Sequence, residues 1–539
     1  RQYYMSGIYA GYGGKTGDGS HGDSKFTVNG NVDMDVTGVA LQANKDGFIT
    51  VRGGKIKTHE IKTSETYAML AEEGSVFMNT GTNGNEPGME DVEVYGNLGV
   101  INKNYGYDPN PGNHASLVSI ALTTSKSKLT GGVLNEFAEN GNNPHQSGID
   151  IYLKNGGLWE NRWIGTERAA AVQKRENKDS YLYTGSKVRK LIGGASEAER
   201  GIIHQKENKP ITVENYNGYE MVYYDHSSDG NIIGGDFVVK HAGEGSHITL
   251  RTDNKGLNTS STKAADKNLV SATLNKLANK LYYEAYTKGE KNLTGKVEIA
   301  EGLTAQSASQ RIEDITYKDA NGQGQYLYTP ATEDDPNPNP NPNPDPNPNP
   351  NPNPDPKPPI IYGSKETQMM KGAKTAMTSA VLLWRGNNND LQRRMGDIRL
   401  AKEENGIWAR YLGGKNELDK KNASFKQTYN IAQVGYDKKK GNWTIGAALD
   451  YGTGKDTYAN GTGKEKLASL ALYGAMQKED GQYLDIILRG SRIKNDYTVY
   501  NEMNHRLDGK YRTGGLSVSV EYGKRMKKEN GFYIDPSIE

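Results

Sequence analysis

The chain has 539 residues, of which only 34% are hydrophobic, whereas 65 are glycine and 34 are tyrosine. This composition argues against a compact Leu/Ile core and favours elongated β structure, with glycine in turns and tyrosine on half-buried strand faces. Lysine and arginine number 66 against 65 acidic residues, so the formal net charge of +1 gives no overall field that would draw the chain to nucleic acid.

The residues that are missing from the sequence bear on where the protein works. There is no cysteine, which fits an exported Gram-negative protein, because a periplasmic disulfide would lock a chain that must still move. No segment reaches the roughly 18 apolar residues of a membrane helix. The chain begins at Arg1 and shows no signal peptide, so we expect a fragment or a processed form.

Residues 1–330 carry short strand-like runs such as "GFITVRGGKIKT" and "GIDIYLKNGGLWENRW", separated by Gly, Asn and Asp turns. Runs of this length, broken at irregular intervals, predict an all-β stack, and their rhythm favours a solenoid although no strict repeat is present. One stretch differs, because Val270, Leu274, Leu277 and Leu281 recur at helical spacing. We expect one amphipathic helix there, packed on the β stack.

Residues 331–361 form a linker, and within it "PNPNPNPNPDPNPNPNPNPDPKPP" repeats one decapeptide. Alternating proline removes half of the amide donors and holds each asparagine extended, so this stretch predicts a polyproline-II conformation. At about 3.1 Å per residue it would span on the order of 70 Å. We interpret it as a stalk between two domains.

Residues 362–539 follow a different pattern. Ser364 is an N-cap candidate for a helix over 365–397, with a kink expected near Gly386. The period then changes to two: "NWTIGAALDY" places Ile445 and Leu449 on one face and Asp450 on the other. Similar segments are "GIWARYLGG", "QYLDIILRG" and "GGLSVSVEYG".

Strands of about ten residues with one apolar and one polar face are typical of a transmembrane β-barrel. Alternation alone fits equally a soluble antiparallel sheet with one wet face. The charged residues Asp485, Arg489 and Glu521, opposite uninterrupted apolar faces, favour a polar lumen and a lipid exterior. About six strands and the start of a seventh are present, so we expect the barrel to be truncated.

The motifs "LLWRGNNNDLQRRMGDIRL", "GIWARYLGGK" and "YNIAQVGYDKK" resemble the start of the translocator domain of monomeric autotransporters (type V secretion). The resemblance implies a parallel β-helix of the pectate-lyase-like kind as the passenger, and a helix in the lumen of an outer-membrane barrel. It also implies that residues 210–330 are a C-terminal passenger segment that folds first outside the cell. The implied partners are outer-membrane lipid, the barrel-insertion machinery, periplasmic chaperones and a host or cell-surface ligand, for a monomeric chain with its passenger at the cell surface.

Some relatives cut themselves in the lumen at an Asn-Asn pair upstream of a basic-Met-Gly-Asp element. Alignment on Met395 places this pair at Asn389 and Asp390, where the second asparagine is replaced by aspartate. Asn387 and Asn388 form a true pair two residues earlier. The resemblance therefore makes Asn389–Asp390 a hypothetical self-cleavage site, and a polar helix bend near Gly386 is the alternative interpretation.

No catalytic constellation is recognisable in residues 1–330. Asp18, His21 and Asp23 fit no calcium-loop spacing, and Glu90, Asp91 and Glu93 form an acidic run that is common in secreted β-helices. Four histidines show no ligand spacing: His59, His114, His204 and His241. We expect no metal and no cofactor, and we interpret most of the tyrosines as packing between coils.

These observations predict an autotransporter that secretes and displays its own β-helical passenger, which would be an adhesin or a structural surface protein. An alternative is an autotransported hydrolase, acting on proteins, esters or polysaccharides, whose catalytic part is unseen or upstream of Arg1. A third hypothesis, a soluble β-rich fibre, is disfavoured by the strand alternation after the helix. The lack of catalytic motifs favours a non-enzymatic passenger.

Overall fold

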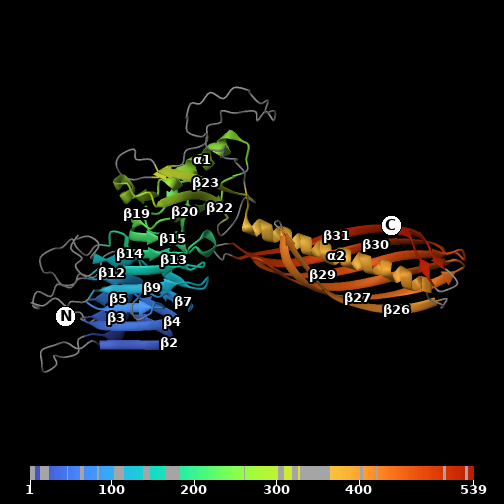
Figure 1. The fold of residues 1–539 in the computed structure, drawn as a ribbon, viewed down its shortest axis with the longest axis horizontal. Helices are drawn as coiled ribbons and strands as arrows, with labels where there is room; N and C mark the ends of the chain where they lie inside the picture. Colours follow the sequence, from blue (N-terminus) through green and yellow to red (C-terminus); the bar gives the residue numbers. More distant parts are fainter. Residues whose placement is uncertain are drawn as a thin grey trace, which may run out of the picture. The chain divides into compact units, whose positions relative to one another are not determined.

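Short strands fill the first part of the chain in the computed structural model (Figure 1). Many of their valine, isoleucine and leucine side chains are buried. The described residues divide into two compact units, Arg1–Lys365 and Glu366–Glu539, here called unit 1 and unit 2. The structure describes residues 6–11, 24–44, 46–60, 66–81, 84–101, 115–136, 146–165, 183–259, 261–301, 309–317, 326–327, 365–400, 405–420, 423–501, 506–527 and 532–539. The predicted linker, 331–361, lies outside them.

The strands of unit 1 stack in three parallel columns, and the long strand β4 belongs to two of them. The first column is β1 (Ser6–Ala10), β3 (Val39–Asn44), β5 (Tyr67–Glu72), β8 (Asn97–Val100) and β11 (Val133–Asn135). The second is β2 (Ser24–Thr37), β4 (Gly47–His59), β6 (Ser75–Met78), β9 (Leu117–Leu122), β12 (Gly148–Leu153), β14 (Ser186–Ile192), β16 (Ile211–Asn217), β19 (Phe237–Ala242) and β21 (Leu281–Tyr283). The third continues from β4 through β7 (Val92–Tyr95), β10 (Lys128–Thr130), β13 (Leu158–Asn161), β15 (Ile202–Gln205), β17 (Met221–His226), β20 (Ser246–Asp253) and β22 (Leu293–Ala300).

Equivalent positions on successive coils carry aliphatic side chains that stack inside unit 1. Ile49, Val76, Val118 and Ile149 are cross-strand partners on four coils, and all four are fully buried. Each coil therefore buries its apolar residues against the coil before it and the coil after it. This parallel stacking confirms the predicted β-helix.

The parallel stacking ends where the chain reverses direction. Strand β23 (Ser309–Tyr317) pairs antiparallel with β22, and β24 (Tyr326–Leu327) pairs antiparallel with β23. The short β18 (Ile232–Ile233) pairs antiparallel with β17. Helix α1 (Ala264–Ala278) packs here and buries Val270, Leu274 and Leu277, as the sequence predicts. The prediction for Leu281 is wrong, since the helix ends at Ala278 and Leu281 begins β21.

Unit 2 is one long helix and an antiparallel sheet that curls around it (Figure 1). The helix, α2 (Gln368–Leu400), runs through Gly386 without interruption. The sheet contains β26 (Asn405–Lys420), β27 (Ala423–Lys440), β28 (Trp443–Tyr458), β29 (Gly461–Gln477), β30 (Gln482–Tyr500), β31 (Arg506–Lys524) and β34 (Ser537–Ile538). In the described residues β26 and β34 are the two sheet edges, and no pairing joins them. A separate hairpin pairs β32 (Met526–Lys527) with β33 (Tyr533–Ile534).

The remaining described elements are short. They are the two-residue strand β25 (Lys365–Glu366) and the 3₁₀ turns at Glu197–Glu199 and Glu284–Lys288. Neither α1 nor α2 combines the length with the apolar content that a membrane-spanning helix needs.

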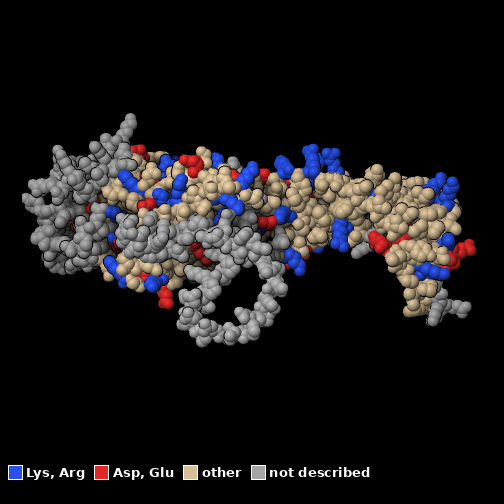
Figure 2. Space-filling view, turned by 90° about the horizontal axis from the view of Figure 1, so that it is seen from above, with Lys and Arg blue, Asp and Glu red and all other residues tan. Residues whose placement is uncertain are grey.

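Side chains of unit 2 alternate strictly between the face toward α2 and the face away from it. Ile407, Leu449 and Val518 lie on the outer face and are 87%, 58% and 65% exposed. On the visible face of unit 2, Figure 2 shows a band almost without charged atoms, with Lys and Arg gathered at its borders. An apolar outer face over a polar inner face is the arrangement predicted from the sequence for a membrane-embedded barrel.

Aromatic rings on the inner face lie over glycines of the adjacent strand. Trp408 pairs across strands with Gly435, and Tyr473 with Gly446. At both glycines a Cβ atom would overlap the facing ring. Tyr483 with Gly523 and Tyr497 with Gly509 repeat the arrangement between β30 and β31. Glycine therefore leaves room for a ring that would otherwise be pushed off the sheet.

Glu220 is a fully buried carboxyl group between coils of unit 1. Its Oε1 accepts a hydrogen bond from the backbone amide of Gly194 at 3.1 Å, and its own amide donates to the Tyr216 hydroxyl at 3.0 Å. Burial raises the pKa of Glu220 to about 8. The folded state therefore holds this carboxyl neutral over a pH range in which the unfolded chain ionises it.

We predict that Glu220→Gln stabilises unit 1 at alkaline pH and leaves it unchanged in acid. In the wild type, stability is full below the ordinary pKa of 4.5 and falls as pH rises through about 8. The gain at pH about 9 is on the order of 5 kcal/mol. It is measured as the temperature at which unit 1 in the full chain loses protease resistance. The exposed Glu244→Gln is the control, and equal gains at both pH values would contradict the prediction.

Candidate functional site

Helix α2 contacts the inner face of unit 2 through three apolar zones separated by two polar centres. The zone near its start joins Met369 and Ala376 to β27, β28 and β30. The middle zone joins Ala380 and Leu383 to β27, β29 and β30. The last zone joins Leu391, Met395 and Ile398 to β28, β29 and β30. The two polar centres lie at Ser379 and Asn387, in the gaps between these zones.

The Ser379 centre collects polar groups from four strands, β27 to β30. The Ser379 hydroxyl lies 2.7 Å from Oε1 of Glu465 and 3.1 Å from Oδ2 of Asp456. Gln427 donates to Oε2 of Glu465 at 2.6 Å and to the Ser379 carbonyl at 3.1 Å. Asn495 donates to Oε1 of Glu465 at 3.0 Å. These bonds hold the helix to the sheet by polar contacts within an otherwise apolar contact surface.

The Asn387 centre surrounds one amide of the helix. The Asn387 side-chain nitrogen Nδ2 donates to Oδ2 of Asp450 at 3.1 Å and to the Ser469 hydroxyl at 3.1 Å. Its oxygen Oδ1 accepts from Gln433 Nε2 at 3.1 Å. Asn387 is fully buried, so all of these contacts are shielded from water.

Arg489 completes the Asn387 centre from β30. Its Nη1 donates to the backbone carbonyl of Asn387 and, at 3.1 Å, to Oδ1 of Asn388. Its Nη2 lies 3.3 Å from Oδ2 of Asp450, and the side chains of Arg489 and Asp450 are 1% and 0% exposed. The pair is therefore buried, with hydrogen bonds that offset part of its desolvation.

Together these contacts polarise one peptide bond. A carboxylate that accepts from the Asn387 amide nitrogen favours removal of a proton from it. A guanidinium that donates to the Asn387 carbonyl stabilises negative charge that develops on that oxygen. The arrangement is suited to attack of the asparagine side chain on its own carbonyl carbon.

The predicted pair Asn389–Asp390 lies elsewhere on the helix. The Asn389 side chain is exposed, and the Asp390 side chain lies outside the described residues. A signal for Asn387 was present in the sequence, since Leu383, Asn387, Leu391 and Met395 repeat every four residues and share one helix face. Alignment on the Met-Gly-Asp element alone missed this signal.

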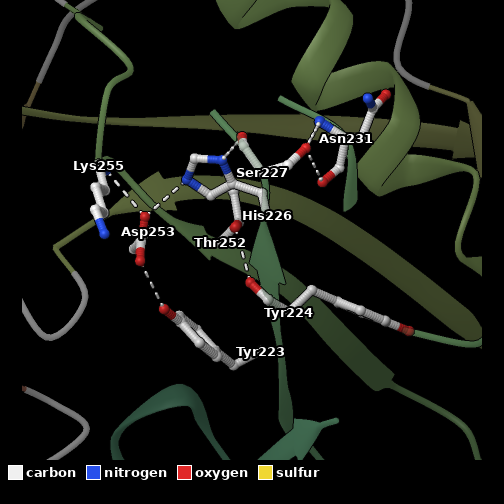
Figure 3. Close-up of polar contacts among 8 residues, drawn as sticks. All are labelled: Tyr223, Tyr224, His226, Ser227, Asn231, Thr252, Asp253 and Lys255. Carbon is white, nitrogen blue, oxygen red and sulfur yellow. Dashed lines mark hydrogen bonds and ion pairs between the residues drawn. The ribbon is translucent and has the colours of Figure 1, made fainter. Parts of the chain in front are cut away.

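In unit 1, His226 and Asp253 form the most buried His–Asp pair among the described residues (Figure 3). The ring nitrogen Nε2 lies 2.7 Å from Oδ1 of Asp253, and Nδ1 lies 2.8 Å from the backbone carbonyl of Ser227. Burial opposes charge on the ring, but the bonds to Asp253 and Ser227 outweigh it and raise the pKa of His226. The Tyr223 hydroxyl donates to the other oxygen of Asp253 at 3.3 Å.

This pair is built for structure rather than for proton transfer. Both ring nitrogens of His226 face acceptors, which leaves none to act as a general base in this arrangement. The Ser227 hydroxyl bonds to Asp229 and not to the ring, and Figure 3 shows its further bonds to the backbone of Asn231. The three side-chain types of a Ser-His-Asp triad are therefore adjacent without the relay that nucleophilic catalysis needs.

The acidic run of unit 1 does not converge on a groove. Glu90 pairs with Arg52 at 2.9 Å and Glu93 with Lys55 at 2.9 Å, while Asp91 accepts from Thr124 at 2.7 Å. Each carboxylate thus has a partner of its own on the surface.

The histidines are spread in the same way. His59 pairs with Asp35, His204 with Asp225 at 3.2 Å, and His241 with Glu290 at 3.2 Å. In the part of the chain that the structure describes, no three His, Cys, Asp or Glu side chains are grouped as a metal site would require. Four of the predicted candidates lie outside the described residues: Asp18, His21, Asp23 and His114.

The C-terminal part of the chain, which includes unit 2, is similar to known proteins. Residues 407–539 match the family model described as "Autotransporter beta-domain". The pertactin autotransporter of Bordetella parapertussis is 31% identical over 166 residues, which are 30% of this chain and 18% of that protein. The BrkA autotransporter of Bordetella pertussis is 30% identical over 181 residues, 32% of this chain and 18% of that protein. The chain therefore spans less than a fifth of the length of these relatives.

A solved structure is also similar, the β domain of the Bordetella autotransporter BrkA. It is 29% identical, the overlap covers 25% of this chain and 55% of that one, and the TM-score is 0.23. The family match and the sequence relatives confirm the resemblance found in the motifs, and with it a location in the outer membrane with a surface-exposed passenger.

Proposed function

We propose, from the premise that residues 407–539 are an autotransporter β-domain, that this chain displays its β-helical unit 1 at the cell surface as an adhesin or structural protein. The observation that carries the proposal is the inner face of unit 2, where α2 is held against a polar sheet whose other face is apolar. Such a sheet fits a barrel with lipid outside and a chain segment inside. Secretion is the role of the autotransporter family; the identity of the passenger is the proposed part.

The polar residues of unit 1 favour a binding role over a catalytic one, because they are engaged with one another. Its surface carboxylates and histidines pair with neighbours, and the His226 ring has both nitrogens engaged. The alternative, an autotransported hydrolase, would place its catalytic part outside the described residues or upstream of Arg1. We further propose that the chain is monomeric and meets the barrel-insertion machinery and periplasmic chaperones on its way to the outer membrane.

We predict that bacteria expressing the full-length protein lose unit 1 when protease is added to intact cells, while unit 2 stays in the membrane as a heat-modifiable band. The same cells should adhere to host cells or to one another more strongly than cells in which residues 24–327 are deleted. Adhesion is counted by microscopy. Hydrolysis of a chromogenic ester, peptide or polysaccharide by the displayed passenger, without added adhesion, would favour the hydrolase instead.

The segment 210–330 is proposed to fold first. It contains the last coils together with α1 and the antiparallel β23, which end the parallel stack. Because each coil of a stack contacts only its neighbours, folding that begins at one end propagates along it.

We predict that deleting residues 211–327 leaves the remaining coils of the displayed passenger sensitive to protease, because they lose the end on which they assemble. Deleting residues 24–59, at the opposite end, should leave the rest resistant. Limited proteolysis of intact cells distinguishes the two. Equal resistance in both deletions would contradict the assignment.

We propose as a second function that the chain cuts itself at the Asn387–Asn388 bond. The Asn387 Nδ2 attacks its own carbonyl carbon, the bond to Asn388 breaks, and the proton lost from Nδ2 passes through Asp450 to the leaving nitrogen of Asn388. Arg489 stabilises the oxyanion. A passenger ending in a succinimide is released, and no water or cofactor is consumed. The pair Asn389–Asp390 stays the alternative cleavage site.

We predict that Asn387→Ser abolishes release of the passenger from outer membranes, whereas the matched control Asn389→Ser does not. Asp450→Asn should slow release by about 100-fold or more, since it removes the base. N-terminal sequencing of the membrane fragment should begin at Asn388. A fragment that begins at Asp390, or loss of release in Asn389→Ser alone, would assign the cut to the other pair. A wild-type chain that stays intact would exclude cleavage.

A further inference from the structure

The outer face of unit 2 can be followed row by row across its strands, because the register of each strand pair is known. One row is apolar throughout: Ile407, Tyr436, Ala447, Leu472, Leu488 and Val518. The next row toward the end where α2 begins is also uncharged: Ala409, Val434, Leu449, Leu470, Gly490 and Leu516. These rows are the middle of the band that faces lipid in the proposed function.

The rows that follow change character abruptly on β29, β30 and β31. Arg492 lies between Ala468 and Gly514, and Lys466, Lys494 and Arg512 are direct cross-strand partners in the next row. Lys464 and Lys510 flank Asp496 in the row after that. We call these six cations the basic patch: Lys464, Lys466, Arg492, Lys494, Lys510 and Arg512.

The patch carries a large excess of positive charge over a small area. All six side chains are exposed or point to the outer face, and Asp496 is the one carboxylate within their three rows. In the described part of the chain no ion pair joins the six cations to a carboxylate. Adjacent strands lie about 4.8 Å apart, so Lys466, Lys494 and Arg512 are held closer together than unpaired like charges favour.

Charges further along the strands are balanced, which makes the patch distinct. Glu417 pairs with Lys426 at 3.2 Å, and Arg506 pairs with Asp508 at 2.9 Å. The excess is therefore confined to the strip between the apolar band and these ion pairs. This strip lies toward the ends of the strands that are near the start of α2, because Asn460 in the β28–β29 turn donates to the carbonyl of Gln368, the first residue of α2, at 3.0 Å.

We propose that the basic patch binds the phosphate groups of a membrane lipid headgroup at the surface next to the apolar band. The acyl chains of the same lipid lie against the apolar rows, and the flexible Lys and Arg side chains extend from the band edge to the headgroup. Several anions on one lipid would relieve the repulsion among the cations. Each basic residue near an anionic lipid surface contributes about 1 kcal/mol. The inference rests on the proposed lipid-facing role of the outer face.

The test uses the full-length protein in zwitterionic detergent micelles, titrated with lipid A and followed by native mass spectrometry. The triple variant Lys466→Gln, Lys494→Gln, Arg512→Gln should bind lipid A on the order of 100-fold more weakly than the wild type. The control removes the same charge at the opposite ends of the strands, by Lys438→Gln, Lys439→Gln and Lys440→Gln, and should bind as the wild type does. Lipid A without its phosphates should bind both variants equally, and inorganic phosphate should not compete.

Heat-modifiable migration of each variant separates the possible failures. If the folded band is present and the triple variant binds lipid A as tightly as the control does, the patch has no lipid role and the proposal is overturned. The proposal is also overturned if phosphate-free lipid A distinguishes the triple variant from the control variant as strongly as intact lipid A does. If passenger display falls in the triple variant without any change in lipid binding, the patch serves a protein partner and the proposal is again overturned. If no variant, nor the wild type, shows a folded band, the proposed barrel itself is contradicted.

Discussion

The side-chain period of two in the strands of unit 2 is the constraint on which the rest of this unit depends. It places Asp450, Ser469 and Arg489 toward α2 and puts Leu449, Leu470 and Leu488 on the other face. A slip of one residue in any strand would exchange the two faces. The polar centres that hold the helix, the apolar band and the basic patch are consequently specified together, by the same strand register.

Both units consist of strands whose successive side chains point to opposite faces, but the aliphatic face is turned in opposite directions in the two units. In unit 1 the aliphatic residues of each strand point inward, and cross-strand partners such as Ile49 and Val76 fill the inside of the coils. In unit 2 the aliphatic face points outward, and the inside is occupied by a helix that bonds to polar side chains. A buried core stabilises unit 1 in water, whereas unit 2 needs an apolar solvent to cover its outer face.

Much of this fold follows from local sequence patterns, and the remainder depends on contacts that are distant in the chain. Alternation in "NWTIGAALDY" predicts which residues of β28 face outward, and helical spacing predicts the buried face of α1 up to Leu277. The contact of Arg489 with Asn387 joins residues about 100 positions apart, and no local pattern encodes it. The basic patch is similar, because Lys466, Lys494 and Arg512 become neighbours only once the register of three strands is known.

The rings that lie over glycines in unit 2 have a consequence for how this sequence is able to vary. In the pairs Trp408–Gly435 and Tyr473–Gly446, the ring on one strand fills the space that a side chain at the facing glycine would otherwise occupy. Enlarging the glycine without shrinking the ring creates a clash, and shrinking the ring alone opens a gap over bare backbone. Substitutions at the two positions should therefore be accepted in pairs, so that divergent sequences with this sheet would show correlated losses of glycine and aromatic residue.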